Sequence, residues 1–268
     1  MIDLTKTLLK GIFTMKLKIM TFNIRFDNPD DGVNCFNGRK EYIKKFLDRE
    51  KPDIIGFQEV LPHVRAWLNE NLTDYVVIGM GRGKNYDDES STIAYRKDIF
   101  DLVSFEQFML SDSPDVQGSR YTLDQSGCPR IAAIATLVVR EEGKVFSFCN
   151  THLDHIGKLA RYSGMTLILS KLMGAHKPPF IITGDLNATP DEEAIKLLRS
   201  HKEIKELTAG IPDDFATFHN YGKIKDNYKI DYIFTTLDEV KGSLKVYDEH
   251  YGDIYLTDHF PISAEAEI

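Results

Sequence analysis

Six short apolar segments of this 268-residue chain each carry an acid, an amide or an imidazole at or near their end. Apolar or alternating runs of about four to eight residues are typical of β-strands, so the chain is expected to fold around strands that end in polar side chains. Polar groups at a strand edge usually serve a site or a turn. The polar residues of the six segments are Asn23, Glu59, His152, Asp185 with Asn187, Asp231, and Asp258 with His259.

The segment Gly-Asp-Leu-Asn at 184–187 follows the apolar run 179–183, which has the length of a buried strand. Side chains two positions apart on a strand point to the same face, so Asp185 and Asn187 are expected to face one ligand. A turn followed by a helix cap is the alternative, because Asp, Asn and Pro are ordinary turn residues. The other segments favour a site, because together they supply side chains suited to a hard cation, a phosphate and an activated water.

Six motifs carry these residues in a definite order. They are Thr-Phe-Asn-Ile-Arg at 21–25, Gln-Glu at 58–59, Asn-Thr-His-Leu-Asp-His at 150–155, Gly-Asp-Leu-Asn at 184–187, Ile-Asp-Tyr-Ile at 230–233 and Thr-Asp-His-Phe-Pro at 257–261. The ordered set resembles the endonuclease/exonuclease/phosphatase superfamily, which includes pancreatic-type deoxyribonucleases, abasic-site endonucleases, poly(A) deadenylases, neutral sphingomyelinases and inositol-polyphosphate 5-phosphatases. Segments 108–115 and 128–131 are similar to a bacterial branch of this deoxyribonuclease I-like superfamily, close to deadenylase-type members. Arg25 stands where abasic-site endonucleases carry an acid, which weakens a DNA-repair function.

The resemblance implies an α/β fold of four layers, in which two packed, mainly antiparallel β-sheets are flanked by helices. The length and the 42% hydrophobic content are sufficient for one catalytic domain over residues 15–268. Periodicity predicts helices near 37–50, 62–71, 157–174 and 190–200. Strands are expected near 17–23, 53–59, 75–79, 91–96, 131–140, 144–151, 179–184, 230–235, 243–248 and 261–267.

Hydrolysis of a phosphate ester requires charge neutralisation, a positioned base and stabilisation of the departing oxygen. Carboxylate oxygens suit Mg²⁺ or Mn²⁺, so we expect one of these ions as cofactor. Glu59 is the first expected metal ligand, followed by Asp258 and the carbonyl oxygen of Asn23. The sequence therefore predicts a metal-dependent phosphoesterase, acting on monoesters or diesters.

The resemblance also implies roles for the remaining motif residues. Asp185 is expected to orient or activate the attacking water, and Asn187 to hold the same water or a phosphate oxygen. His259 is expected to contact the scissile phosphate, with Asp231 fixing its tautomer, because a buried acid without a partner is costly. His152 is expected to donate to the phosphate.

Three further residues are candidates for substrate binding. Arg130 and Arg161 could bind phosphate, although an arginine paired with an acid is equally consistent with the sequence. Glu89 resembles a site-facing acid of the deadenylase-like branch, and as a bare sequence feature it belongs to an acidic loop.

The net charge of −8 favours a small phosphate ester as substrate, because proteins that track duplex DNA normally present a basic surface. A nuclease acting on single-stranded RNA or DNA is the alternative, and it would need stacking aromatics near the site. An inactive binding module is less consistent with the sequence, since every essential acid and histidine is present. The sequence implies no obligate protein partner.

Cys35, Cys128 and Cys149 have no Cys-x-x-Cys spacing and are expected to be free thiols in a reducing compartment. Residues 1–14 are expected to be a leader extension outside the fold. This stretch is too short and too charged for a transmembrane helix, and it has no signal-cleavage pattern. We therefore expect a cytoplasmic protein without a membrane span.

Overall fold

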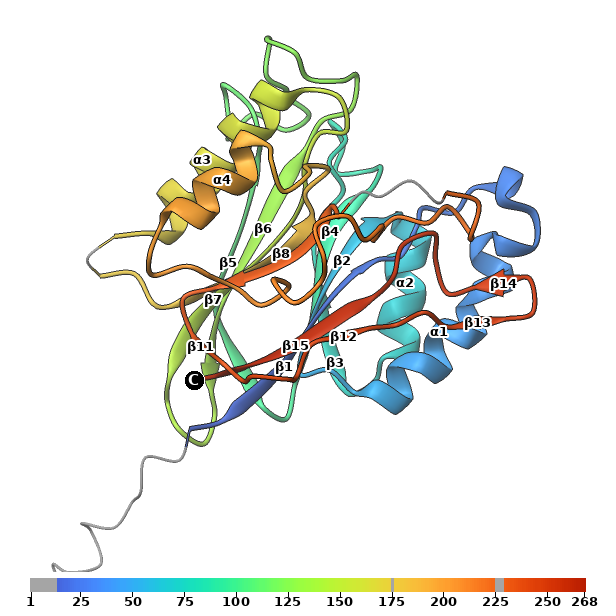
Figure 1. The fold of residues 1–268 in the computed structure, drawn as a ribbon, viewed down its shortest axis with the longest axis horizontal. Coiled ribbons are helices and arrows are strands. Elements are labelled where there is room, and N and C mark those ends of the chain that lie inside the picture. The colour runs from blue at the N-terminus through green and yellow to red at the C-terminus, as the bar shows by residue number, and fades with distance from the viewer. Residues whose placement is uncertain (1–13, 175, 225–228) are drawn as a thin grey trace, which may run out of the picture.

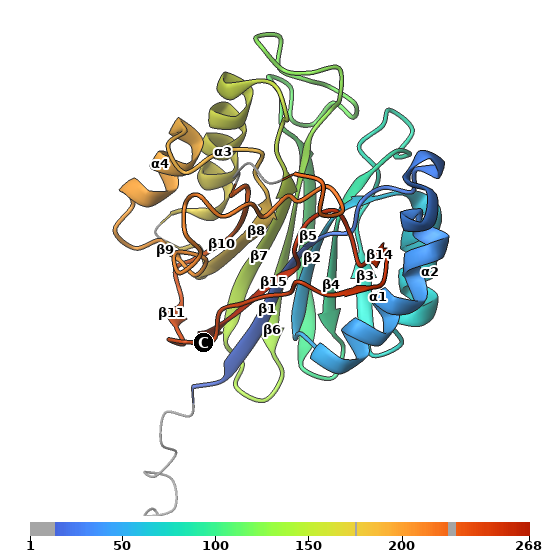
Figure 2. The same ribbon diagram turned by 45° about the vertical axis from the view of Figure 1, so that its right-hand side comes forward.

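The computed structural model describes residues 14–174, 176–224 and 229–268. The leader expected over residues 1–14 falls outside this part of the chain, apart from Thr14. Two β-sheets pack face to face, and helices cover the outer face of each, as Figures 1 and 2 show. The fold class expected from the sequence, a four-layer α/β sandwich, is therefore confirmed.

The first sheet has the strand order β11-β15-β1-β2-β4-β3, with β12 pairing on β15. Only the pair β1 and β2 is parallel among its ladders, and the others are antiparallel. Its strands are β1 (Lys16–Asn23), β2 (Ile54–Val60), β3 (Tyr75–Ile78), β4 (Ser90–Arg96), β11 (Asp238–Glu239), β12 (Lys245–Val246) and β15 (Ile262–Glu267).

The second sheet has the strand order β5-β6-β7-β8-β10-β9, with one parallel pair, β7 and β8. A separate two-stranded ribbon joins β13 (His250–Tyr251) to β14 (Ile254–Tyr255). The strands of the second sheet are β5 (Phe100–Met109), β6 (Ile131–Val139), β7 (Val145–His152), β8 (Phe180–Asp185), β9 (Lys205–Glu206) and β10 (Asp231–Thr235).

Three apolar clusters hold the layers together. The cluster between the sheets includes Ile19, Phe148 and Ile262. Helices α1 (Phe36–Glu50) and α2 (Pro62–Asn71) pack on the first sheet, and α3 (Lys158–Leu172) and α4 (Glu193–Ser200) pack on the second (Figure 2). A short 3-10 helix, η2 (Pro29–Asn34), precedes α1.

Most expected elements are present with small shifts at their ends, but one expected strand is much shorter and one long strand was not expected. The strand expected near 243–248 is reduced to the two residues of β12. The ten-residue strand β5 was not expected, because a register shift between Leu102 and Ser104 interrupts its alternation and much of its surface is exposed. The three cysteines are free, as expected. Among the described residues, none of the helices has the length and apolar character needed to cross a bilayer.

Candidate active site

The carboxyl ends of four strands meet at one edge of the two sheets. The parallel pair β1 and β2 and the parallel pair β7 and β8 each end at a common edge, and β10 adds Asp231 opposite Asp185. A cavity of about 520 Å³ opens at this edge, and we call it the polar cavity. The expected site residues in its walls are Glu59, Glu89, Arg130, His152, Asp185, Asn187, Asp258 and His259.

A buried amide joins the two sheets directly beneath the cavity. Asn150 on β7 donates through Nδ2 to the backbone oxygens of Phe57 (2.7 Å) and Thr92 (2.9 Å) in the other sheet. Its Oδ1 accepts from Gln58 Nε2 at 2.7 Å. A Cβ atom at Gly56 would lie 2.2 Å from the hydroxyl oxygen of Thr183, so only glycine permits this approach of the sheets. The close approach brings side chains of both sheets within hydrogen-bonding distance of one another.

The imidazole of His259 lies between two carboxylates. Its Nδ1 lies 2.9 Å from Asp231 Oδ2, and its Nε2 lies 3.6 Å from Asp185 Oδ2. Burial opposes protonation, but the Asp231 carboxylate outweighs it and raises the pKa of His259 to about 10. The contact expected between Asp231 and His259 is present, although Asp231 itself lies beneath the cavity wall. At neutral pH this imidazole is a cation that can donate to a phosphate oxygen.

Asp185 ends β8 at the centre of the site. Its Oδ1 accepts from the backbone N–H of Asn187 at 3.0 Å, and its Oδ2 accepts from Asn23 Nδ2 at 3.0 Å. Burial, with further contributions from the charges of Asp231 and Glu59, raises the pKa of Asp185 to about 7. A carboxylate with a pKa near neutrality is suited to exchanging a proton with water.

Asn187 faces the cavity, but for a different reason from the one expected. Strand β8 stops at Asp185, and Asn187 has a left-handed backbone with φ 47°, so strand alternation does not set its direction. Its Nδ2 donates to His152 Nε2 (2.9 Å) and to the backbone oxygen of Leu153 (3.0 Å). The imidazole of His152 therefore carries its proton on Nδ1. Burial, followed by the nearby positive charge of Arg130, holds the pKa of His152 well below its usual value, so this ring is neutral.

Glu59 projects from a bulge in β2. The ladder with β4 shifts between Phe57 and Val60, and Glu59 has φ 63°, which turns its side chain out of the regular strand pattern. Its Oε1 accepts from Asn23 Nδ2 at 2.9 Å, and its Oε2 accepts from the backbone N–H of Phe26 at 2.9 Å. The bulge therefore aims this carboxylate into the cavity.

Glu59, Asp185 and His259 form a group whose potential ligand atoms lie within 4.8 Å of one another. This set differs from the expected metal ligands Glu59, Asp258 and Asn23. The carbonyl oxygen of Asn23 accepts from the backbone N–H of Arg25 at 3.0 Å, and its amide nitrogen faces Glu59 and Asp185. In this orientation the Asn23 amide acts as a donor to the acids, and its role as a metal ligand stays a prediction.

Asp258 lies in the cavity wall beside a fixed arginine. Its Oδ2 lies 3.5 Å from Arg25 Nε, and Arg25 Nη1 lies 4.0 Å from Glu59 Oε2. Asp31 accepts hydrogen bonds from the same Nε at 3.0 Å and from Nη2 at 3.3 Å. Burial raises the pKa of Asp258, and the charge of Glu59 acts in the same direction. The site thus concentrates more acidic groups than Arg25 and His259 neutralise, which suits a divalent cation.

Two arginines and an acid form the opposite wall. Arg130 is 4% exposed, and its Nε and Nη1 have no hydrogen-bond partner within the described part of the chain. Arg82 donates to Glu89 at 2.8 Å. Burial and the charge of Glu59 raise the pKa of Glu89 to about 7. The Nε of Arg130 lies 3.7 Å from Asp154 Oδ2, so Nη1 is the donor that remains for an anion.

Arg161, the third expected substrate-binding residue, lies elsewhere. Its Nε and Nη2 donate to Glu192 Oε2 at 3.1 and 2.6 Å, and its Nη1 donates to the backbone oxygen of Asp154 at 2.8 Å. It is not among the residues that line the polar cavity. The alternative considered from the sequence, an arginine paired with an acid, describes its position, and Arg161 is not part of the site.

The sequence matches the model of the endonuclease/exonuclease/phosphatase family over residues 20–259. The chain belongs to this family. Family members are hydrolases of phosphate ester bonds, so the protein is a phosphoesterase of this group. No protein with a curated functional description matched the chain.

Solved structures of the family share the fold. An endonuclease/exonuclease/phosphatase from Bacteroides vulgatus is 31% identical, with a TM-score of 0.84 over 95% of this chain and 99% of that one. The mannosyl-6-phosphatase Bt3783 of Bacteroides thetaiotaomicron is 27% identical, with a TM-score of 0.79 over 94% and 99% of the two chains. The human Nocturnin catalytic domain, at 20% identity and a TM-score of 0.69 over 93% and 92%, agrees in fold.

Some cavity residues of this family member escaped the sequence analysis. Arg82 lines the cavity from a tight loop. A Cβ on Gly81 would lie 2.0 Å from the backbone oxygen of Asp87, so this loop requires glycine. The Gly-Arg-Gly sequence at 81–83 was therefore the only local indication of the loop. Phe26 and Phe218 also line the cavity. Nothing local in the sequence distinguished these two rings from core residues.

Proposed function

We propose that the polar cavity hydrolyses a small phosphate ester with the help of Mg²⁺ or Mn²⁺. The observation that carries the proposal is the buried group of Glu59, Asp185 and His259. Arg130 lines the same cavity, and its buried Nη1 has no hydrogen-bond partner within the described residues. Acids for a cation and donors for an anion are what a phosphoesterase needs in one cavity.

The carboxylates of this group fit a hard divalent cation, and the group contains no thiolate. Glu59 would hold the ion together with Asp258, which lines the same cavity, and Asp185 lies beside Glu59 in the group. His259 is protonated and would face the phosphate. A bound Mg²⁺ or Mn²⁺ supplies charge neutralisation at the phosphate.

Side chains of the protein would supply the base, position the water and stabilise the charge on the phosphate. Asp185 accepts the proton of the attacking water, and Asn187 keeps that water in place. His259, protonated because of Asp231, donates to a phosphate oxygen. His152 and Arg130 add donors that stabilise the charge of the transition state.

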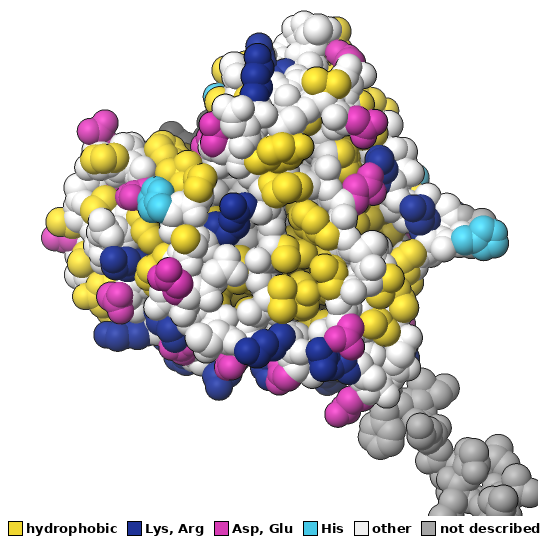
Figure 3. Space-filling model, turned by 180° about the vertical axis from the view of Figure 1, so that it is seen from behind, with side chains coloured by type: hydrophobic (Ala, Val, Ile, Leu, Met, Phe, Trp, Pro, Cys, Tyr) yellow, Lys and Arg dark blue, Asp and Glu magenta, His cyan; other side chains and the backbone are white. Residues whose placement is uncertain are grey.

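A small substrate is favoured by the charge of the protein. Basic side chains are scattered among acidic and apolar ones on the face drawn in Figure 3, and the net charge is −8. Such a surface gains little from counterion release along a polymer. The similarity to the mannosyl-6-phosphatase makes sugar phosphates the first class to test.

A nuclease acting on single strands is the second candidate. Phe26 and Phe218 line the cavity and could stack on bases. Zebrafish (D. rerio) TDP2, which shares the fold at 18% identity, was solved with a single-stranded DNA product. Oligonucleotides therefore belong in the same assay.

Purified protein should be assayed with Mg²⁺ or Mn²⁺ against mannose 6-phosphate, inositol phosphates, p-nitrophenyl phosphate, bis-p-nitrophenyl phosphate, sphingomyelin and oligo(A). We expect turnover of a small ester that disappears after EDTA treatment and returns with added metal. Glu59→Gln should weaken the apparent metal affinity and be partly rescued by excess metal, whereas Asp115→Asn, an exposed residue outside the cavity lining, should match the wild type. Full activity after exhaustive EDTA treatment would refute the proposal, and preference for oligo(A) would favour the nuclease.

A further inference from the structure

A second cavity, of about 460 Å³, lies behind the segment that carries His259, and we call it the ring cavity. The side chains of Phe218 and His259 line the polar cavity, whereas their chain neighbours His219 and Phe260 line the ring cavity. The backbone N–H of His219 donates to the oxygen of Asp258 at 2.9 Å, which fastens the two segments together. The two cavities therefore share a wall but use opposite faces of it.

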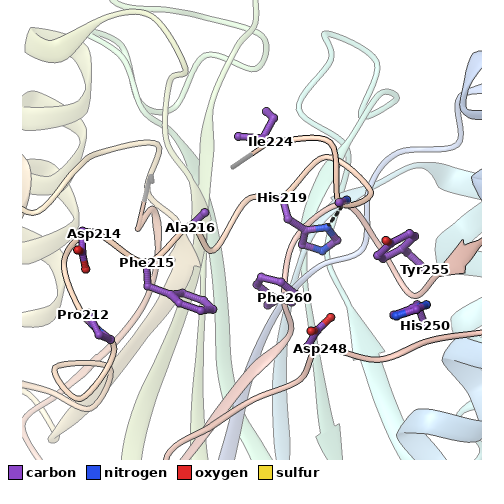
Figure 4. A pocket seen from close by; sticks show the side chains of 11 residues that line it. Pro212, Asp214, Phe215, Ala216, His219, Ile224, Asp248, His250, Tyr255 and Phe260 are labelled. Atoms are coloured by element: carbon purple, nitrogen blue, oxygen red, sulfur yellow. Dashed lines mark hydrogen bonds between the residues drawn. The ribbon is translucent and has the colours of Figure 1, made fainter. Parts of the chain in front are cut away.

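Five rings line this cavity, and in Figure 4 Phe215 lies on one side of His219 and Phe260, with His250 and Tyr255 on the other. Phe260 lies at the centre, 4.2 Å from the ring of His219 and 5.6 Å from that of Phe215. His250 and Tyr255 stack at 4.9 Å on the other side. The His219 ring accepts a hydrogen bond at Nδ1 from the backbone N–H of Gly222, so it is a neutral imidazole. Neutral aromatic faces carry the negative part of the ring quadrupole.

Two carboxylates complete the lining, Asp214 and Asp248. Neither has an ion-pair partner among residues 14–174, 176–224 and 229–268, and the lining contains no lysine or arginine. In Figure 4 the two acids lie on different sides of Phe215 and Phe260. Among the described residues, the charge of the lining is therefore negative, in contrast to the polar cavity, where Arg25, Arg82 and Arg130 accompany the acids.

We propose that the ring cavity binds an organic ammonium group, held against its aromatic faces and neutralised by Asp214 and Asp248. Ring faces attract a cation through the quadrupole, and aromatic cages are a common means of recognising quaternary and methylated amines. The volume lies within the range of small-ligand cavities. An anion, including the phosphate end of a nucleotide, is disfavoured because it would face two unpaired carboxylates and no cation.

The site is tested by binding alone, so its result is independent of the phosphoesterase reaction. Tetramethylammonium chloride is titrated into the full-length protein at constant ionic strength, and the methyl proton resonance is followed by NMR. We expect saturable binding with an upfield ring-current shift. Uncharged tert-butanol, of similar size, should bind at least about threefold more weakly, because it lacks the cation that the rings and acids attract.

Three variants locate the binding. Phe215→Ala removes a ring that is 36% exposed, and Asp248→Asn removes one charge, so each should weaken tetramethylammonium binding at least about threefold while leaving the fold intact by circular dichroism. Asp115→Asn is the matched control and should bind like the wild type. Absence of saturable binding, equal binding of tert-butanol, or wild-type affinity in folded Asp248→Asn would each overturn the proposal.

Discussion

The polar cavity and the ring cavity are built on two faces of the same short segment, Asp258–Phe260, yet their side chains behave differently. In the polar cavity the acids are tied to one another through Asn23, and His259 is tied to Asp231. In the ring cavity Asp214 and Asp248 have no ion-pair partner in the described chain. Side chains that are already oriented suit a reaction, whereas free charges beside ring faces suit the capture of a ligand. One backbone segment thus supports two different kinds of site.

The largest effect should come from Asp185→Asn, which should impair the reaction in the polar cavity without changing ligand binding in the ring cavity. Loss of the water-orienting carboxylate should lower turnover by a factor of roughly 10² to 10⁴, even at saturating metal. Tetramethylammonium affinity should not change, because Asp185 does not line the ring cavity. Steady-state rates across a metal series and the NMR titration measure the two quantities. Rescue by excess metal would show that Asp185 acts mainly as a metal ligand.

Arg130, which lines the polar cavity, and Arg161, which does not, allow a matched comparison of the same substitution. Arg130→Lys should lower kcat/KM by about 10- to 100-fold, because a hydrogen bond to a charged group contributes on the order of 1.5–3 kcal/mol. Arg161→Lys should leave kcat/KM within about twofold and lower the free energy of unfolding by about 1 kcal/mol, since it disturbs the pairing with Glu192. Kinetics and urea unfolding of both variants test this. Equal kinetic losses would place Arg161 in the reaction.

Asp231→Asn should lower turnover by a factor of at least about ten, because the amide no longer fixes the charged imidazole. The pKa of His259, about 10, is raised by Asp231, so its protonated form is present below that pH and is lost as pH rises through it. In the variant the alkaline loss of activity should move to lower pH. A pH–rate profile of both proteins measures the shift. An unchanged alkaline limb would show that His259 does not act as a cation.

The smallest effect concerns His219 in the ring cavity. Burial lowers the pKa of His219 to about 4, below the usual value of 6.5, so its contribution to stability is complete above pH 6.5 and is lost as pH falls toward 4. The loss should be at most about 1.4 kcal/mol per pH unit. His219→Asn keeps an acceptor for Gly222 and should flatten the dependence. Urea unfolding of both proteins at pH 7 and pH 5 provides the measurement. If the free energy of unfolding changed by the same amount between the two pH values in both proteins, the prediction would be contradicted.

The sequence predicted the strands that end in polar residues because apolar runs and their terminal acids are local features. It also led, through the family resemblance, to the contact between Asp231 and His259. The orientation of the Asn23 amide and the left-handed backbone of Asn187 were not predictable in this way. Each depends on backbone geometry beyond the strand end, which alternation does not describe.

The ring cavity could not be predicted either. Its rings come from segments near 215–219 and 250–260, which meet because the backbone of His219 pairs with Asp258. Aromatic residues at such spacings are indistinguishable from core residues in a sequence. Only the tertiary structure shows that they enclose a space with two unpaired acids.

The pairing of β1 with β15 has a consequence for how the protein is made. Asn23 and His259, 3.4 Å apart in the folded protein, are separated by 236 positions in the sequence. One side of β1 therefore stays unpaired until β15 has left the ribosome. Proteins whose contacts join residues far apart in the sequence fold slowly. We expect no turnover from nascent chains that lack β15, and an exposed β1 edge is the segment that a chaperone would need to shield during synthesis.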